Sequence, residues 1–153
     1  MKSYCHTAGN LNRIKNWYGI QRTLTVEVVA AIIIRDDKVL AVQRGKAKFD
    51  YVSYKWEFPG GKVEAGETLE QAVAREILEE LHIQIIPKEL IIKVDHTYPD
   101  FHLIMHCFIC QYDCGDIQLT EHIRLKWLDK NNLESLDWAE ADKPVVNVLS
   151  KTG

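Results

Sequence analysis

The sequence predicts an α/β fold in which strands and two helices share one hydrophobic core. Residues 25–34 (TVEVVAAIII) are almost continuously apolar and rich in β-branched side chains, which is typical of a strand buried on both faces. Residues 68–81 and 141–150 instead repeat apolar side chains at helical spacing. The 153 residues contain no internal repeat and no linker, so we expect a single core.

The other elements follow the first strand in order. After the turn RDD, residues 38–44 (KVLAVQR) predict a partner strand, and residues 45–55 form a long polar and aromatic loop of the kind that often carries function. Later strands are predicted at residues 83–86, 89–98, 101–112 and 122–129, with turns at Pro99-Asp100 and at DCGD. The last helix has Pro144 in its first turn, where the missing amide hydrogen costs nothing.

The first 24 residues carry the weakest pattern. Residues 11–20 (LNRIKNWYGI) are compatible with a short amphipathic helix or with a mobile extension. We therefore divide the chain into an N-terminal extension, residues 1–24, and a domain, residues 25–153.

Composition narrows the class of partner. The formal charge of −3 argues against a protein that binds the phosphate backbone of nucleic acids. No apolar segment is long enough for a signal peptide or a membrane span, so we expect a cytoplasmic protein that does not bind membranes. Cys107, Cys110 and Cys114 have a loose metal-ligand spacing, but their apolar surroundings favour reduced, buried thiols.

The helix at residues 68–81 has a defined beginning and a predicted buried face. Thr68 and Gln71 have the spacing of a capping box, so the helix should begin at Thr68, with Glu67 just outside it. At about 100° per residue, one arc is apolar and is predicted to pack on the sheet. That arc consists of Val73, Ala74, Ile77, Leu78 and Leu81.

A neighbouring arc carries three carboxylates, Glu76, Glu79 and Glu80. Like charges three and four residues apart on a helix repel each other by roughly 0.2–0.5 kcal/mol per pair. Arg75 is expected beside Glu79 and outside the cluster, where it orients a carboxylate without neutralising the group. The arc is either a solvated acidic face or a cation site, and the repulsion favours the cation site.

Two glycines precede the helix in WEFPGGKVEAGE. Gly60 and Gly61 leave their carbonyls accessible to a close ligand. Carboxylates and backbone carbonyls are ligands that Mg²⁺ prefers. A phosphate-binding P-loop is excluded, because Gly61 and Gly66 have its glycine spacing but Glu67 stands where that loop has lysine.

These residues resemble the signature of a known family. Gly61, five residues, Glu67, seven residues and then REILEELHI look like the Nudix box, found in hydrolases of nucleoside diphosphates linked to another moiety. VVAAIII, WEFPGG, TYPDFHL and ADKPVV are similar to the MutT-like branch, from about Thr25 to the end of the chain. The resemblance implies an α/β/α sandwich with a mixed β-sheet between helices, and an enzyme of nucleotide pool sanitation and DNA repair.

The resemblance also implies a set of site residues. Mg²⁺, or Mn²⁺ in its place, would be held by Glu76, Glu79, Glu80 and the carbonyl of Gly60 or Gly61, with Arg75 orienting the carboxylates. Glu121 corresponds to a carboxylate that serves as a base or a further ligand, and the alternative is a solvated turn glutamate. Arg44 would meet a substrate phosphate or base, or it is a surface arginine.

The expected reaction is hydrolysis of a nucleoside triphosphate to the monophosphate and pyrophosphate. Asp142 corresponds to the residue that reads the base edge, and its alternative role is an N-cap before Pro144. Phe58 is either a stacking wall for the base or ordinary packing. Aspartate at this position leaves both oxidised purines such as 8-oxo-dGTP and cytidine nucleotides open, and Phe101 stands where some relatives have arginine.

A second hypothesis is a noncatalytic Nudix module that senses a nucleotide. The presence of Arg75, Glu76, Glu79 and Glu80 together favours catalysis. His82 departs from the family pattern, which has a glycine that ends the helix in a left-handed conformation. We expect the cost of His82 to be structural and not catalytic, and a monomer or a dimer is compatible with the sequence.

Overall fold

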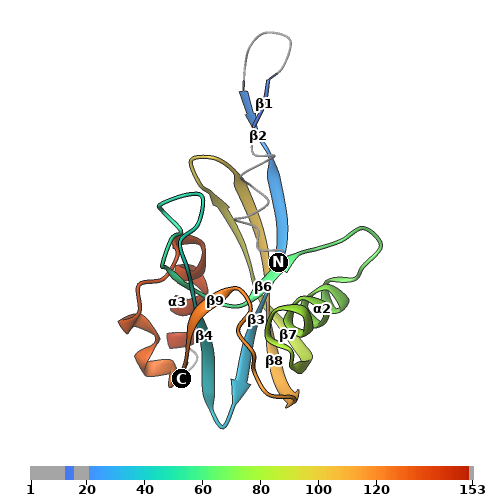
Figure 1. The fold of residues 1–153 in the computed structure, drawn as a ribbon, viewed down its shortest axis with the longest axis vertical. Coiled ribbons are helices and arrows are strands. Elements are labelled where there is room, and N and C mark those ends of the chain that lie inside the picture. The colour runs from blue at the N-terminus through green and yellow to red at the C-terminus, as the bar shows by residue number, and fades with distance from the viewer. Residues whose placement is uncertain (1–12, 16–20, 152–153) are drawn as a thin grey trace.

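The computed structural model describes residues 13–15 and 21–151, and its centre is a mixed β-sheet (Figure 1). Within these residues seven strands join in the order β5-β4-β3-β8-β7, with β6 also pairing with β3 and β9 with β4. The strands are β3 (Thr25–Arg35), β4 (Lys38–Arg44), β5 (Trp56–Glu57), β6 (Gly60–Lys62), β7 (Gln84–Thr97), β8 (His102–Cys114) and β9 (His122–Leu128). The β3–β8 pair is parallel and the other pairs are antiparallel, so the predicted mixed sheet is confirmed.

Helices cover both faces of this sheet. Figure 1 shows α2 (Leu69–Leu81) on one side and α3 (Lys143–Lys151) on the other, together with the short 3-10 helices η1 (Lys130–Ser135) and η2 (Glu140–Asp142). Alternate residues of β3 point to opposite faces. Val29 and Ala31 therefore join the core under α2, whereas Val28 and Ala30 join the core under α3. The three-layer α/β/α sandwich is confirmed.

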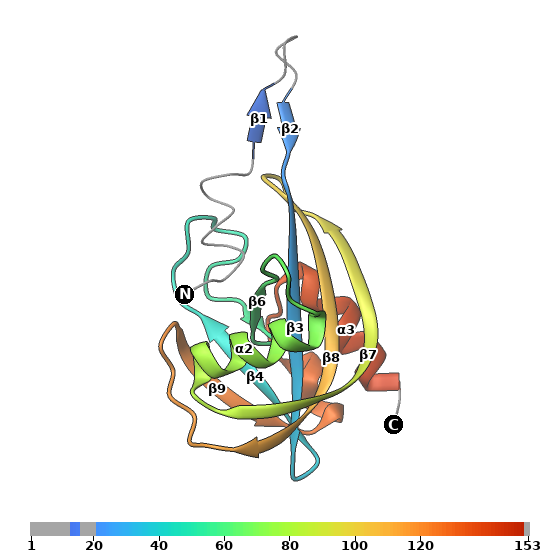
Figure 2. The ribbon, with the colours of Figure 1, turned by 90° about the vertical axis from the view of Figure 1, so that its right-hand side faces the viewer.

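The edge strand β7 corrects one predicted break. The sequence predicts two strands on either side of Pro87, but Gln84–Thr97 is one strand with irregular pairing at Pro87/Glu89. Proline lacks an amide hydrogen and is accommodated on an edge strand or at a bulge, and both conditions hold here. Figure 2 shows β7 following β8 along this edge.

The N-terminal segment contains strand. Arg13–Lys15 (β1) pairs antiparallel with Gln21–Thr23 (β2), apart from the main sheet. The helix considered for residues 11–20 is therefore wrong at residues 13–15, and the rest of that segment lies outside the described residues. No helix among the described residues is long and apolar enough to cross a membrane.

The predicted beginning of α2 is confirmed. Its predicted buried face is correct at Val73, Ile77 and Leu81 but wrong at Ala74 and Leu78. Thr68 accepts a hydrogen bond from the Gln71 backbone, and the Gln71 side chain accepts one from the Thr68 backbone, which completes the capping box. Leu78 is 49% exposed and Ala74 is only half-buried. The buried residues are Ala72, Val73, Glu76, Ile77, Glu80 and Leu81. The prediction rested on the assumption that the carboxylates stay in solvent. In the structure Glu76 and Glu80 are buried, so the buried side of the helix is rotated toward them.

Candidate active site

Two inward-facing carboxylates on α2 form the centre of the candidate site. Glu76 is completely buried and Glu80 is 2% exposed. Glu76 Oε1 and both carboxylate oxygens of Glu80 are buried without a hydrogen-bond partner. Burial raises the pKa of Glu76, and burial together with the charges of Glu57, Glu76 and Glu121 raises the pKa of Glu80 well above its usual range. Burial of carboxylate oxygens without hydrogen-bond partners lowers the stability of the fold, so this pair indicates a functional role.

The two glycines are explained by what lies against them. A Cβ atom at Gly61 would sit 2.3 Å from Cδ of Glu76, so only glycine leaves room for that carboxylate beside β6. A Cβ at Gly60 would sit 1.9 Å from the backbone oxygen of Val29 on the paired strand. Gly61 thus admits Glu76 to the core, and Gly60 permits the close approach of β6 to β3.

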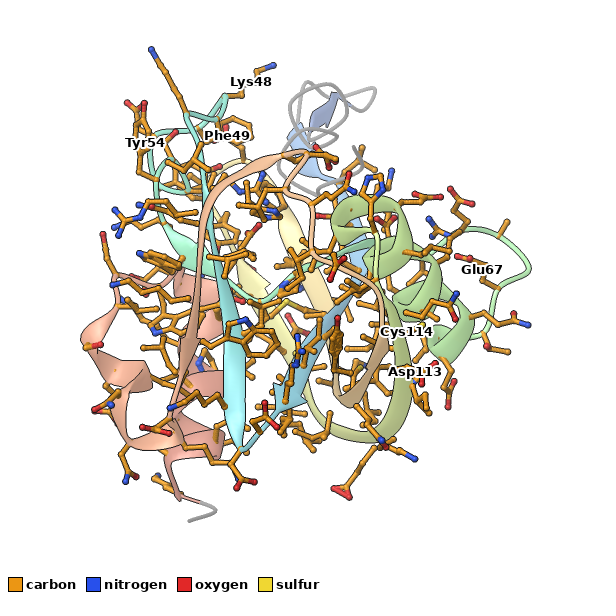
Figure 3. All side chains as sticks on the ribbon, turned by 60° about the horizontal axis from the view of Figure 1, so that its bottom comes forward. Lys48, Phe49, Tyr54, Glu67, Asp113 and Cys114 are labelled. Carbon is orange, nitrogen blue, oxygen red and sulfur yellow. The ribbon has the colours of Figure 1, made fainter. Side chains whose placement is uncertain are left out.

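Arg75 lies within the carboxylate group, which corrects its predicted position. Its guanidinium donates to Glu76 Oε2 at 3.1 Å and to Glu79 Oε1 at 3.3 Å. It also donates to both oxygens of Glu67, at 2.5 and 2.9 Å, and to the carbonyl of Lys62 at 2.9 Å. Glu67 lies on the loop that leads into α2 (Figure 3). Arg75 therefore ties this loop to one oxygen of Glu76 and leaves the other unpartnered.

Glu79 differs from its two neighbours. Its side chain is 47% exposed and contacts Arg75, while Glu76 and Glu80 point into the protein. The structure thus brings Glu76 and Glu80 together and leaves Glu79 at the solvent edge of the group.

A second buried network meets the site, and sequence reasoning missed two of its members. Arg44 donates to both oxygens of Glu57, at 2.9 and 3.0 Å, and His122 Nε2 lies 2.8 Å from Glu57 Oε2. All three side chains are buried, so the alternative of a surface arginine at Arg44 is wrong. Burial opposes ionisation of Glu57, but the charge of Arg44 and the hydrogen bond with His122 lower the pKa of Glu57 to about 2.

The sequence held a signal for Glu57 and His122. Glu57 is a charged residue between the apolar residues Trp56 and Phe58, both of which are buried. His122 directly follows Glu121 and begins β9, which pairs with β4 at Arg44. A charged residue enclosed by core residues indicates a paired interior group, but the pairing itself is visible only in the fold.

Glu121 is brought to the end of α2. The neighbouring Thr120 hydroxyl donates to the backbone oxygen of Glu80 at 3.1 Å, and the charge of Glu121 contributes to the raised pKa of Glu80. Glu121 is half-buried, so it is not a fully solvated turn residue. The loop before β9 therefore adds a third carboxylate near Glu80.

The side chain of Asp142 binds the backbone of Phe58 and does not cap a helix. Its Oδ1 accepts a hydrogen bond from the Phe58 backbone at 3.1 Å, and Oδ2 is buried without a partner, so the alternative of an N-cap is wrong. Burial, with the charge of Glu57 next, raises the pKa of Asp142 well above its usual range. The Phe58 ring is buried and stacks on Trp138 at 4.6 Å between centroids. Phe58 is thus packed within the core, and its backbone amide orients Asp142.

The long loop at residues 45–55 is held mainly by aromatic packing. Tyr51 stacks between Phe49 and Tyr98, each at 5.2 Å, and its hydroxyl donates to Asp100 at 2.9 Å. Tyr54 is 54% exposed and lies at the outer end of the loop (Figure 3). Phe101 is completely buried in the same aromatic group, which explains why an apolar residue stands there.

The donor set fits a divalent cation. In the described part of the chain, no three His, Cys, Asp or Glu side chains are grouped so that they could hold a metal ion, and this includes the predicted carboxylates and the three cysteines. Cys107 and Cys110 are buried, as expected, but Cys114 is exposed. Three carboxylate oxygens on Glu76 and Glu80 nevertheless lack partners in the interior, and oxygen donors of this kind suit Mg²⁺.

Comparisons with known proteins agree with this geometry. Residues 25–149 match the model of the NUDIX domain. The chain is 36% identical over 124 residues to the CTP pyrophosphohydrolase of Escherichia coli, covering 81% of this chain and 90% of the relative. It is 30% identical over 126 residues to the 8-oxo-dGTP diphosphatase of the same organism, covering 82% and 97%.

A solved structure has the same architecture. The solution structure of a MutT protein of the Nudix hydrolase family from methicillin-resistant Staphylococcus aureus superposes with a TM-score of 0.67 at 38% identity. The superposition covers 84% of this chain and 98% of the other. Members of this family typically use a divalent metal ion. The chain therefore belongs to the Nudix family and is a pyrophosphohydrolase of the MutT-like type.

Proposed function

We propose that the chain is a Mg²⁺-dependent nucleoside triphosphate pyrophosphohydrolase, which converts an NTP or dNTP and water to the monophosphate and pyrophosphate. The observation that carries this proposal is the three buried carboxylate oxygens without a hydrogen-bond partner, one on Glu76 beside Gly61 and two on Glu80. A solvated acidic helix would not turn these side chains inward, because desolvation of two carboxylates is unfavourable without a compensating charge.

The residues of the chain have separable roles in this proposal. Glu76, Glu80 and a carbonyl of Gly60 or Gly61 hold the cation, with Glu79 at the solvent edge and Mn²⁺ as a possible replacement for Mg²⁺. A divalent cation, when bound, neutralises phosphate charge and lowers the pKa of an attacking water. Arg75 fixes Glu76 by holding one of its oxygens, so the other is left for the cation. Glu121 accepts the proton of the attacking water or serves as a further ligand.

Asp142 is the proposed reader of the base. Its Oδ1 is fixed by the Phe58 amide, so Oδ2 is the oxygen left for a ligand. Ionised aspartate accepts a hydrogen bond from an exocyclic amine, and protonated aspartate also donates one. The raised pKa favours the protonated form, which can pair with a base edge that carries both a donor and an acceptor. Arg44 acts indirectly, because its charge holds Glu57 in place.

Two substrate classes follow from the relatives and from Asp142. One is the oxidised purine dNTPs, such as 8-oxo-dGTP, in a role of nucleotide pool sanitation. The other is the cytidine nucleotides. The names of the curated relatives motivate both.

The test is pyrophosphate release with Mg²⁺ across a panel of canonical and oxidised triphosphates. We expect turnover of 8-oxo-dGTP or of CTP and dCTP at least tenfold faster than of the other canonical triphosphates. Asp142→Asn is expected to shift the ratio of kcat/KM toward 8-oxo-dGTP. Equal rates on all substrates would contradict the proposed role of Asp142 but not hydrolysis itself.

The alternative is a noncatalytic nucleotide sensor with the same fold. It predicts nucleotide binding with no release of pyrophosphate above that of the Glu80→Gln variant. The pairing of Arg75 with Glu76 favours hydrolysis, because a sensor does not require an oriented carboxylate.

A further inference from the structure

His122 lies between the two buried networks with one ring nitrogen on each side. Its Nε2 is 2.8 Å from Glu57 Oε2, and Glu57 is held on both oxygens by Arg44. An ionised carboxylate only accepts hydrogen bonds, so Nε2 carries the hydrogen and donates to Glu57. The guanidinium of Arg44, bonded to both oxygens, also favours the ionised carboxylate at Glu57. In the neutral ring, Nδ1 therefore presents a lone pair.

That lone pair faces the candidate cation site. His122 Nδ1 is buried without a hydrogen-bond partner and lies 4.0 Å from Glu80 Oε1, which also has none. Two unpartnered acceptors, a nitrogen and a carboxylate oxygen, thus face each other in the protein interior. At 4.0 Å these two atoms are too far apart to hydrogen-bond with each other, and a cation between them would satisfy both.

We propose that His122 Nδ1 is a nitrogen ligand that shares the cation with Glu80, an inference that rests on the proposed function. Ligand bonds of roughly 2.0–2.2 Å allow two donor atoms of one ion to lie about 4 Å apart on opposite sides of it. A histidine that binds a metal almost always donates its other ring N–H to a carboxylate or a carbonyl, which fixes the ring and raises its basicity. The order Glu57, His122, cation, Glu80 has this arrangement.

A nitrogen ligand changes which ion the site prefers. Imidazole suits transition metals, whereas carboxylates and water suit Mg²⁺, and affinity rises from Mn²⁺ to Co²⁺ at a given site. We therefore expect the site to bind Mn²⁺ and Co²⁺ more tightly than Mg²⁺ and to lose most of this preference when Nδ1 is removed.

The direct test is electron spin echo spectroscopy on the wild-type protein loaded with one equivalent of Mn²⁺ and no nucleotide. Coordination by His122 predicts modulation from a directly bound imidazole ¹⁴N, which changes to the ¹⁵N pattern when the histidines are labelled with ¹⁵N. Binding of Mn²⁺ and of Mg²⁺ is measured in parallel by calorimetry. None of these readouts depends on turnover.

Variants identify the histidine. His122→Asn should abolish the nitrogen modulation and weaken Mn²⁺ binding about tenfold or more, with a smaller effect on Mg²⁺. His106→Asn is the matched control, because His106, on β8, also pairs through Nε2 with a glutamate, Glu27 of β3, at 2.7 Å. This control should keep both the modulation and the affinity.

Bound Mn²⁺ without nitrogen modulation in the wild-type protein would overturn the inference, since His122 would then face Glu80 without binding the ion. Pyrophosphate release by the same preparation would leave the proposed function standing. A wild-type protein that binds no Mn²⁺ and releases no pyrophosphate would overturn both.

Discussion

Gly61 and Glu76 are a matched pair: the missing side chain of the glycine is the space that the glutamate carboxylate occupies. A Cβ at Gly61 would lie 2.3 Å from Cδ of Glu76 and 2.4 Å from its Oε1. These two residues are fifteen positions apart in the sequence, on β6 and α2. The carboxylate of Glu76 enters the core only because residue 61 has no side chain.

This pair predicts different outcomes for two glycine variants. Gly61→Ala displaces the end of a flexible side chain, so it should fold but lower kcat by about a hundredfold, as misplacement by about 1 Å can. Gly60→Ala meets the backbone of Val29 and should cost about 3 kcal/mol of stability or more. Denaturant unfolding and pyrophosphate release measured on both variants check this. Equal losses of stability would contradict it.

Glu80→Gln should separate function from stability. Removing the charge of a buried, unpartnered carboxylate relieves desolvation, so the metal-free variant should be at least as stable as the wild-type protein. Pyrophosphate release should fall by about a hundredfold or more. Thermal unfolding in a chelator and the Mg²⁺ assay measure the two effects. Retained turnover in this variant would remove Glu80 from the site.

The rotated face of α2 is tested by two neighbouring residues. Ile77 is completely buried, so Ile77→Ala should cost about 2–5 kcal/mol. Leu78 is about half exposed, and Leu78→Ala should change the free energy of unfolding by less than about 0.5 kcal/mol. Denaturant titration of both variants is the measurement. A large cost at Leu78 would restore the face that hydrophobic periodicity predicts.

His82→Gly should stabilise the protein without affecting turnover. His82 ends α2 with φ 62° and ψ 28°, a left-handed conformation that costs a non-glycine residue roughly 1 kcal/mol. The gain is therefore about 1 kcal/mol or less, because glycine also loses more backbone entropy on folding. Thermal unfolding and kcat are measured together. A large change in kcat with unchanged stability would show that the effect is not conformational.

Asp142 should make stability fall as pH rises. Its pKa is raised in the folded protein, so the stabilising contribution of its protonated form is present below the usual aspartate pKa and is lost as pH rises through the folded value. The gain in stability of Asp142→Asn over the wild-type protein should grow as the pH rises above the usual aspartate pKa. Asp129→Asn, at an exposed residue paired with Lys38, is the control and should show no such trend.

The sequence located the site because its chemistry is local. The Nudix box, the capping box at Thr68 and the glycines before α2 lie within about one helix and its preceding loop. That Glu76 and Glu80 lie one turn apart on the same side of the helix follows from helical spacing alone. The strands at residues 25–35 and 38–44 were equally predictable, since β-branched apolar runs separated by a turn leave little choice.

What the sequence did not reveal depends on contacts between distant segments. Glu57 and His122 are 65 residues apart and meet only because β5 and β9 both pair with β4. Asp142 reaches the Phe58 amide across 84 residues. The periodicity of apolar residues along the sequence does not predict which distant residues pair in this way.

The sequence by itself determined the family, the first two strands of the domain, and the helix that carries the carboxylates, because these follow from nearest-neighbour periodicity and a contiguous motif. Only the tertiary structure decided that Glu76 and Glu80 point inward, that Arg75 binds within their group, and that Arg44, Glu57 and His122 form a second network beside them. The physical reason is that burial of charge is set by the partners that surround it in space, and those partners come from every part of the chain.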